Sequence, residues 1–557
     1  MKNTQYTFVL FMLFWVGPQS IFPLTAQRGT DSLFREHIEY LASEELEGRL
    51  TSGPGEKLAA EYIAAEFEQA GLLPAGDNGS YFQRFPFVKY RIASIQNPLL
   101  LSETIPLEAY NHFHPLTMST DTAQLENLAI MGLEFGVETE EYSLPLPQVP
   151  TIAVIKTGLP EGVSMHSPEA LKMRLSIRVK QLESLGYSGV IVCKEHSGVT
   201  DVPDKRLRPR GSKLGIPVVF ADTTYEFITT YPTASFSYTI HDIYAEGINV
   251  VAQTPRKRRR NLVLGAHYDH IGRGELGGSR SKTEGIHYGA DDNASGTAMV
   301  IELAHSVQKR RLRRYQYTVV AFSGEELGLL GSGYFVNNAP LDLSRTRLMM
   351  NFDMVGRLDS AQTLTVGGTG TCLSFNRILS ASDSGSLHIV RDPAGTAPTD
   401  HTHFYYKNVP VMSFFTGLHG EYHTPMDVDS LINYEGMEQI YEYVMSILRQ
   451  TNRFRNRKAA FQKSERPKKE AAAFKVTLGV MPDYAYQGKG LKVSGSNPGG
   501  PAEQGGVLAG DIIVKIGEMD IDDIYGYMNA LSVLKPGQET PIEVLRNEER
   551  VVLNLKL

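Results

Sequence analysis

Residues 262–296 combine the pattern of a buried strand, a polar turn and the start of a helix. Residues 262–266 (LVLGA) are an apolar run typical of a buried strand, and His267 and Asp269 follow it. Residues 289–296 (GADDNASG) form a polar turn, after which apolar residues recur at helical spacing. Histidine and aspartate at a strand end and at a helix start indicate a metal site on an open α/β sheet.

Strand and helix patterns alternate on both sides of this stretch. Apolar runs predict strands at 248–252, 262–266, 317–322, 348–352 and 409–415. The helical spacing of apolar residues predicts helices before Gly71 and at 296–309 and 435–448. The alternation predicts an α/β fold, in which a mixed sheet with a mostly parallel core is sandwiched between helices.

The chain of 557 residues is too long for one hydrophobic core, so we expect several domains. One main α/β domain is assigned to residues 27–116 and 244–450. Residues 117–243 have a strand and helix pattern of their own, which predicts a small α/β module inserted into the main domain. A charged linker is predicted at 451–474, followed by a β-rich domain at 475–557.

The first 26 residues have the pattern of a signal peptide. Lys2 precedes an apolar run at 8–16, and Leu24-Thr25-Ala26 is typical of a cleavage site. This run is much shorter than the ~20 residues that a membrane span needs. We therefore expect an exported protein, periplasmic or extracellular, without a stable membrane span; a retained membrane anchor is the alternative.

Charge and cysteine content give little functional indication. The net charge of −7 does not suggest a nucleic-acid partner. Two basic runs, at 256–260 and 310–314, are interpreted as solvated turns, with a patch for an anionic surface as the alternative. The two cysteines, Cys193 and Cys372, lie in apolar runs and are predicted to be small buried residues.

Acids and histidines follow several of the predicted strands. A dinuclear hydrolase holds two divalent ions about 3.5–4 Å apart through a bridging carboxylate, and zinc binds imidazole and carboxylate ligands in such open sites. The chain offers that set at strand ends and in the following loops: His267, Asp269, Asp292, Glu325, Glu326, Asp353 and His423. Taken singly, each has an alternative: Asp292 could cap a helix, and Glu325 or Glu326 could be solvated.

Five motifs in order along the chain, AHYDH, GADDNASG, FSGEELGLLGS, NFDMVG and EYHTPMD, resemble those of dinuclear zinc aminopeptidases of the bacterial leucyl aminopeptidase type. That family also contains glutamate carboxypeptidases, glutaminyl cyclases and the catalytically inactive transferrin receptor. The resemblance covers residues 31–116 and 244–450. It implies two Zn²⁺ ions per chain, although manganese or cobalt could occupy one position.

The resemblance also implies a role for each residue. His267 and Asp353 would bind one zinc ion, Glu326 and His423 the other, and Asp292 would bridge both, with a cis peptide bond between Asp292 and Asn293. Glu325 would be the general base for water bound to both metals. Asp269 would fix the tautomer of His267, and Tyr422 would stabilise the oxyanion. His423 is chosen because its flanking residues match the motif; the competing imidazoles are His270, His287, His401, His403 and His419.

The substrate pocket is less well indicated. Related aminopeptidases can carry an arginine before the Asp-His pair that is Asp400-His401 here, whereas this chain reads GTAPTD up to Asp400. Asp400 is interpreted as a turn carboxylate, with support of the site as the alternative.

Both additional domains carry resemblances. The module at 117–243 resembles a protease-associated domain, which would restrict or orient substrates; a purely structural insertion is the alternative. Residues 475–557 resemble a PDZ domain, with Leu478-Gly-Val480 as the loop for a peptide carboxylate, and could bind a peptide C-terminus as an added strand. A docking or spacer role is the alternative for the PDZ domain.

The sequence thus predicts an exported zinc aminopeptidase that acts on the N-terminal bond of peptides. Three alternatives stay open: an enzyme like the glutamate carboxypeptidases, one like the glutaminyl cyclases, and a non-catalytic peptide-binding scaffold.

Overall fold

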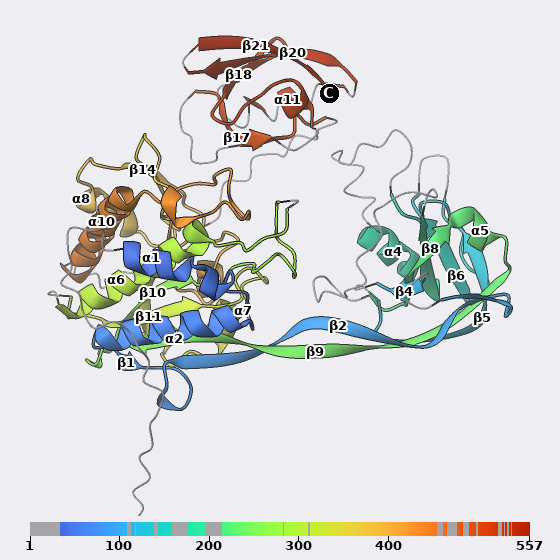
Figure 1. Ribbon diagram of the computed structural model, residues 1–557, viewed down its shortest axis with the longest axis horizontal. Helices are drawn as coiled ribbons and strands as arrows, with labels where there is room; N and C mark the ends of the chain where they lie inside the picture. Colours follow the sequence, from blue (N-terminus) through green and yellow to red (C-terminus); the bar gives the residue numbers. More distant parts are fainter. Residues whose placement is uncertain are drawn as a thin grey trace, which may run out of the picture.

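The computed structural model describes most of the chain between Phe34 and Leu557 (Figure 1). Outside the described residues lie 1–33, 109–112, 117–118, 139–142, 159–174, 195–213, 282, 310–311, 454–460, 465–475, 483–488, 497–499, 522–525, 528–529, 532–533, 536 and 548. The predicted signal peptide and much of the predicted linker therefore fall outside them. Among the described residues, no helix is both long and apolar enough to cross a membrane.

The main domain is built on parallel strands, as predicted. β10 (Asn261–His267) lies between β11 (Gln316–Phe322) and β12 (Thr346–Phe352), and β15 (Val411–Phe415) lies beyond β12. All three pairings among these strands are parallel. β13 (Thr363–Gly367) pairs antiparallel with β15 and parallel with β14 (His388–Arg391). The predicted mixed sheet with a parallel core is confirmed.

Helices cover both faces of this sheet because its strands are apolar on both sides. On one face, Leu262 and Leu264 belong to a core that they share with α2 (Pro54–Gln69), α6 (Gly296–Lys309) and α10 (Tyr434–Arg453). On the other face, Val263 belongs to a second core with α7 (Leu330–Asn337) and α9 (His401–Tyr406). The side chains of β10 therefore alternate between the two cores, and nothing in the strand faces water.

A two-stranded ribbon connects the main domain to the inserted module. β2 (Phe82–Leu101) and β9 (Thr233–Gln253) pair antiparallel along almost their whole length, and Figure 1 shows them running from one lobe to the other. Three shifts of register interrupt this pairing. The core of the module already includes Ala93, Leu99 and Phe113, which precede the expected boundary at 117.

The module itself contains parallel strands covered by helices. β5 (Thr122–Gly132), β6 (Thr151–Lys156), β7 (Gly189–Lys194) and β8 (Val218–Thr224) follow one another in the sheet, and their mutual pairings are parallel. α4 (Leu175–Ser184) packs on one face through Val179 and Leu182. Cys193, in β7, and Cys372, in the main domain, are both free and buried, as predicted.

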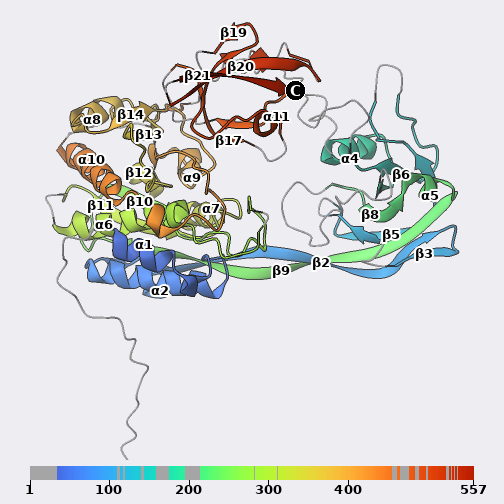
Figure 2. The same cartoon turned by 45° about the horizontal axis from the view of Figure 1, so that its top comes forward.

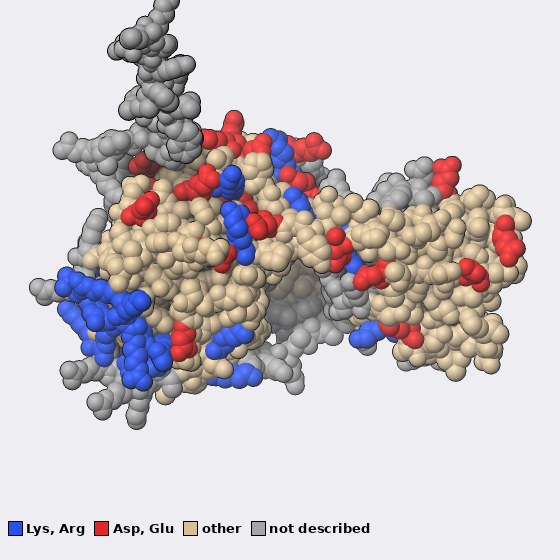
Figure 3. Space-filling view, turned by 90° about the horizontal axis from the view of Figure 1, so that it is seen from below, with Lys and Arg blue, Asp and Glu red and all other residues tan. Residues whose placement is uncertain are grey.

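Basic side chains gather at the end of the main domain that is distant from the module (Figure 3). Residues 256–260 precede β10, and Arg313 and Arg314 precede β11, so both loops lie at the amino-terminal ends of the parallel strands. The guanidinium of Arg258 donates to the carbonyl of Arg313 (3.0 Å), which joins the two loops. Residues 256–259 are exposed, consistent with solvated turns.

The C-terminal domain is a second, antiparallel sheet that lies above the main domain (Figure 2). It contains β16 (Val480–Pro482), β17 (Leu491–Ser496), β18 (Ile512–Ile516), β19 (Met519–Asp520), β20 (Glu539–Arg546) and β21 (Glu549–Lys556). A cavity of about 370 Å³ separates it from the main domain, and its walls include Arg357 and His419 on one side and Lys492 on the other. The loop after β15 therefore faces the C-terminal domain.

Candidate metal centre

The predicted site residues lie at one edge of the parallel sheet. Parallel strands bring their carboxyl ends to the same edge, which is where open α/β sheets bind ligands. The residues are His267 at the end of β10, Asp292 in the turn Ala290–Ser295 before α6, Glu325 and Glu326 after β11, Asp353 after β12, and Tyr422 and His423 in the loop after β15.

These side chains form two groups that share Asp292. In the first group, Nε2 of His267 lies 3.4 Å from Oδ1 of Asp292 and 3.5 Å from Oδ1 of Asp353. In the second group, Nε2 of His423 lies 3.1 Å from Oδ2 of Asp292 and 3.2 Å from Oε2 of Glu326. Asp292 thus turns one oxygen toward each group, as a bridging carboxylate does.

The spacing of these atoms fits zinc. A zinc ion with bonds of about 2.0–2.2 Å and tetrahedral angles holds its ligand atoms about 3.3–3.6 Å apart. The four contacts in the two groups span 3.1–3.5 Å. Nε2 of His423 is buried and forms no hydrogen bond to any described residue. An imidazole nitrogen that faces two carboxylates in this way is suited to a cation.

The second ring nitrogen of each histidine sets its tautomer. Nδ1 of His423 donates to the carbonyl of Gly278 (2.9 Å), which leaves the lone pair of Nε2 directed into the second group. Nδ1 of His267 lies 3.1 Å from the main-chain carbonyl of Asp269 and 3.7 Å from its carboxylate. The tautomer of His267 is therefore set by the main chain of Asp269, where the sequence analysis expected the carboxylate.

The carboxylate of Asp269 has other partners. It accepts hydrogen bonds from the hydroxyl of Thr51 (2.9 Å) and from the backbone N–H of Glu325 (3.2 Å). Asp269 thus fixes the start of the loop that carries Glu325 and Glu326. Its side chain is completely buried.

The turn before α6 directs Asp292 into the site. The peptide bond between Asp292 and Asn293 is cis, as the resemblance implied. Oδ1 of Asn293 accepts from the N–H of Gly296 (3.0 Å), so Asn293 provides the cap that was considered for Asp292. The carboxylate of Asp427 accepts from the N–H groups of Asp291 and Asp292 (3.0–3.1 Å). The turn is therefore satisfied without the Asp292 side chain.

Two carboxyl groups of the site, those of Asp292 and Glu325, have pKa values shifted in opposite directions. Burial raises the pKa of Asp292, but His267 and His423 together lower it by more. The pKa of Asp292 therefore lies well below its usual range. Burial raises the pKa of Glu325 well above its usual range; His267 opposes the rise, and Glu326 and Asp353 add to it. One carboxylate is thus kept ionised, as a ligand must be, and the other can hold a proton.

Residues 249–448 match the model of peptidase family M28, and residues 464–557 match the model of the PDZ domain. The chain carries an M28 peptidase domain. The β-rich domain at its C-terminus is a PDZ domain, as predicted.

Similar proteins include several aminopeptidases. The chain is 25% identical over 281 residues to aminopeptidase YwaD of Bacillus subtilis. The matched segment covers 48% of this chain and 58% of that protein. It is 24% identical over 213 residues to a probable leucine aminopeptidase of Arthroderma otae, covering 36% and 56%. An aminopeptidase of Pseudomonas aeruginosa is 26% identical over 345 residues, covering 58% and 56%. The chain therefore spans little more than half of each of these relatives.

The solved structures of two aminopeptidases are also similar. A zinc aminopeptidase from Bacillus subtilis gives a TM-score of 0.46 at 21% identity, covering 77% of this chain and 97% of that chain. An aminopeptidase from an Aneurinibacillus strain gives 0.45 at 21% identity, covering 78% and 94%.

Arg49 supports the M28 domain in a way that the sequence did not indicate. Its side chain is 1% exposed and donates to the carbonyls of Tyr268 (2.7 Å), Tyr288 (2.8 Å), Gly289 (2.9 Å) and Leu41. These carbonyls belong to the segment after β10, the segment before the Asp292 turn, and α1 (Arg35–Leu41). One guanidinium therefore holds together both halves of the metal-binding motif.

Three further residues near the centre are not among the predicted ligands or catalytic groups. His270, considered only as a competing imidazole, lies in the second group. Asp400, interpreted as a turn carboxylate, is completely buried, and burial raises its pKa to about 7. Glu56, for which nothing was predicted, is also buried. An apolar environment for an acid is set by tertiary packing, which short motifs do not reveal.

Tyr422 lies against the second group. Its ring stacks on that of His423, with ring centroids 3.9 Å apart. Burial, and then the nearby carboxylates of Asp292 and Glu326, raise the pKa of the phenol. Tyr422 therefore keeps its proton at neutral pH and remains a hydrogen-bond donor. Of the other competing imidazoles, His287, His401, His403 and His419 lie outside both groups.

Glu56 is expected to make the stability of the M28 domain dependent on pH. Its carboxylate accepts from the N–H groups of Ser52 (2.7 Å) and Ile248 (3.1 Å) and from the hydroxyl of Ser323. Burial outweighs these bonds and raises the pKa of Glu56 to about 7. The folded state therefore binds a proton that the unfolded state releases between about pH 4.5 and 7.

Over that interval we expect Glu56 to reduce the free energy of unfolding as pH rises, by up to about 3 kcal/mol. Below about pH 4.5 the stabilising effect of the protonated form is fully present. Denaturant unfolding of the metal-free protein at a series of pH values should show a shallower decline for Glu56→Gln than for the wild type. Parallel curves for the two proteins would contradict the assignment.

Proposed function

We propose that the chain is an exported, zinc-dependent aminopeptidase that hydrolyses the N-terminal bond of peptides. The observation that carries the proposal is the pair of ligand groups sharing Asp292 inside an M28 domain, with Glu325 beside them. The aminopeptidases among its relatives support the same reaction. The predicted signal peptide is the basis for placing the protein in the periplasm or outside the cell.

His267, Asp292 and Asp353 would hold one zinc ion, and Asp292, Glu326 and His423 the other. When bound, such a centre lowers the pKa of a water nucleophile and polarises the scissile carbonyl. Glu325 would take the proton of the attacking water and return it to the leaving amine, and its raised pKa suits both steps. The hydroxyl of Tyr422 would donate to the oxyanion.

Selection for a free N-terminus would come from the surrounding acids. By resemblance the candidates are Glu325, which lies beside the ligand groups, and Asp353, which belongs to the first of them, and an ammonium group would compensate part of their charge. The inserted module, as a protease-associated domain, would limit access to the centre, and the PDZ domain would bind a peptide C-terminus. Peptides are therefore the proposed substrates and partners.

The proposal can be tested with a panel of aminoacyl chromogenic amides and their N-acetylated counterparts, with zinc content measured on the same samples. We expect turnover of the free-amine substrates, little turnover of the acetylated ones, and about two zinc ions per chain. Equal cleavage of both sets would contradict an aminopeptidase. Release of C-terminal glutamate, or cyclisation of N-terminal glutamine, would indicate one of the alternative enzymes. Absence of both metal and turnover would indicate a scaffold.

A further inference from the structure

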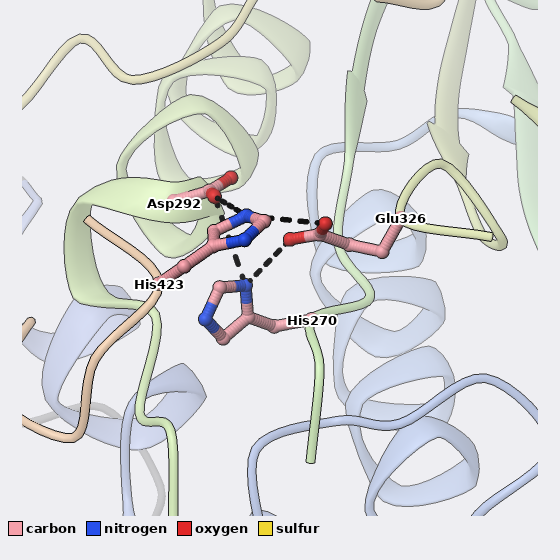
Figure 4. Close-up of side chains that lie close together, drawn as sticks. All are labelled: His270, Asp292, Glu326 and His423. Atoms are coloured by element: carbon pink, nitrogen blue, oxygen red, sulfur yellow. Dashed lines mark hydrogen bonds and ion pairs between the residues drawn. The ribbon is translucent and has the colours of Figure 1, made fainter. Parts of the chain in front are cut away.

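His270 places a second imidazole in the Glu326 group. Its Nδ1 lies 2.8 Å from Oε1 of Glu326 and 3.8 Å from Oδ2 of Asp292. All four ligand atoms of the group, including Nε2 of His423, lie within 4.8 Å of one another. Figure 4 shows the four side chains directed toward a common point. The group thus has the two imidazoles and two carboxylates of a four-ligand zinc site.

The two groups differ in how many ligands the protein supplies. The first group offers three donor atoms, from His267, Asp292 and Asp353, and the second offers four. Structural zinc sites are closed by four protein ligands, whereas catalytic sites keep a position for water or substrate. The two groups therefore differ in whether they leave a position for water or substrate.

We propose that His270 is a metal ligand, which makes the centre asymmetric: a closed, tight position at His270, Asp292, Glu326 and His423 beside an open, weaker position at His267, Asp292 and Asp353. The tight position fills first and fixes the bridging carboxylate, and the open position admits water and substrate. This inference rests on the metal centre of the proposed function but not on aminopeptidase activity.

The backbone around His270 holds the ring in this place. Leu50 and His270 form a parallel β-bridge, and the N–H of His270 donates to the carbonyl of Arg49 (3.3 Å). Gly289 lies directly against the ring, because a Cβ atom there would come within 2.6 Å of its carbons. The ring is completely buried, and its Nε2 has no hydrogen-bond partner among the described residues. All the described polar contacts of the ring therefore run through Nδ1 into the second group.

The other role open to His270 is the hydrogen bond from its Nδ1 to Oε1 of Glu326, whose 2.8 Å separation is that of such a bond. The two roles predict different behaviour of His270→Asn. Asparagine places an amide donor close to the position of Nδ1, so it preserves a hydrogen bond to Glu326 but is a poor zinc ligand. His270→Ala removes both functions.

The experiment is a titration of the metal-free, full-length protein with zinc against a competing chelator. For the wild type we expect two steps of unequal affinity. In His270→Asn and His270→Ala alike, the tight step should weaken by at least about 100-fold, the upper end of what loss of a ligand's hydrogen-bond partner costs. Titration with Co²⁺ should show a changed visible spectrum for the first ion bound to His270→Asn.

His287→Asn is the matched control. His287 is a buried imidazole in the same loop, bonded through Nε2 to the hydroxyl of Ser279 (2.8 Å), and it lies outside both groups. Its variant should bind both ions as the wild type does. Wild-type affinity and Co²⁺ spectrum in His270→Asn, with weakening only in His270→Ala, would overturn the proposal in favour of a hydrogen bond. If the wild type binds no zinc, the metal centre of the proposed function fails as well.

Discussion

Replacement of Glu325 by glutamine is expected to lower kcat by about 10²–10⁴-fold, the range associated with loss of a general acid–base group. Glutamine has nearly the same size as glutamate but cannot accept the proton of the attacking water. Glu325 contributes no ligand atom to either group, and its backbone N–H, which anchors the loop to Asp269, is unaffected by the substitution. The variant should therefore keep the full zinc content while losing turnover.

The measurement combines steady-state kinetics on a free-amine substrate with metal analysis of the same preparation. Glu442→Gln provides a control for the substitution itself, because Glu442 is an exposed residue of α10 that pairs with Arg449 (3.3 Å). Its kcat should stay at the wild-type value. A Glu325→Gln protein that has lost zinc would show a structural role for Glu325, and one with unchanged kcat would exclude it as the base.

The parts of the molecule that the sequence predicts well are those in which local pattern and function coincide. The helix predicted at 296–309 has those bounds in α6, and the strand predicted at 317–322 differs from β11 by one residue. The motifs place their acids and histidines at the ends of apolar strands or in the loops that follow them. Parallel pairing then brings these residues together whatever their separation along the chain, so strand ends alone indicate where the site lies.

The parts that the sequence does not predict depend on contacts between distant segments. The β2–β9 ribbon joins residues more than a hundred positions apart, and its alternation is broken by shifts of register. His270 reads as one imidazole among several, because its place in the second group depends on the bridge to Leu50. Arg49 has no motif, because its four partners are backbone carbonyls, which any residue could supply.

Replacement of Arg49 by methionine is expected to destabilise the M28 domain by about 3–5 kcal/mol, comparable to breaking a buried ion pair. Methionine fills much of the same volume but leaves four buried carbonyls without their donor. Burial lowers the pKa of Arg49 to about 10, and Asp292 and Asp427 oppose that shift, so the side chain is charged at neutral pH. The substitution also removes a positive charge that interacts with several buried acids, among them Asp292 and Asp427.

That second effect distinguishes Arg49 from a purely structural hydrogen-bonding group. In the metal-free protein the acids repel one another without Arg49, whereas bound cations would compensate their charge. The loss of stability should therefore be larger after chelation than with saturating zinc. Denaturant unfolding followed by circular dichroism under both conditions measures the difference, with the PDZ transition as an internal reference. Arg49→Lys should fall between wild type and Arg49→Met, because one ammonium group cannot reach all four carbonyls.

The control for Arg49 is Arg84→Met, which removes an exposed arginine that pairs with Glu246 (2.7 Å) on the ribbon. Exposed pairs of this kind contribute about 0–1 kcal/mol, so Arg84→Met should unfold close to the wild type. An Arg49→Met protein with the same small effect would show that the carbonyls are satisfied in another way. Equal destabilisation with and without zinc would contradict the electrostatic role of Arg49. Its hydrogen bonds to the two halves of the metal-binding motif would then account for the whole effect.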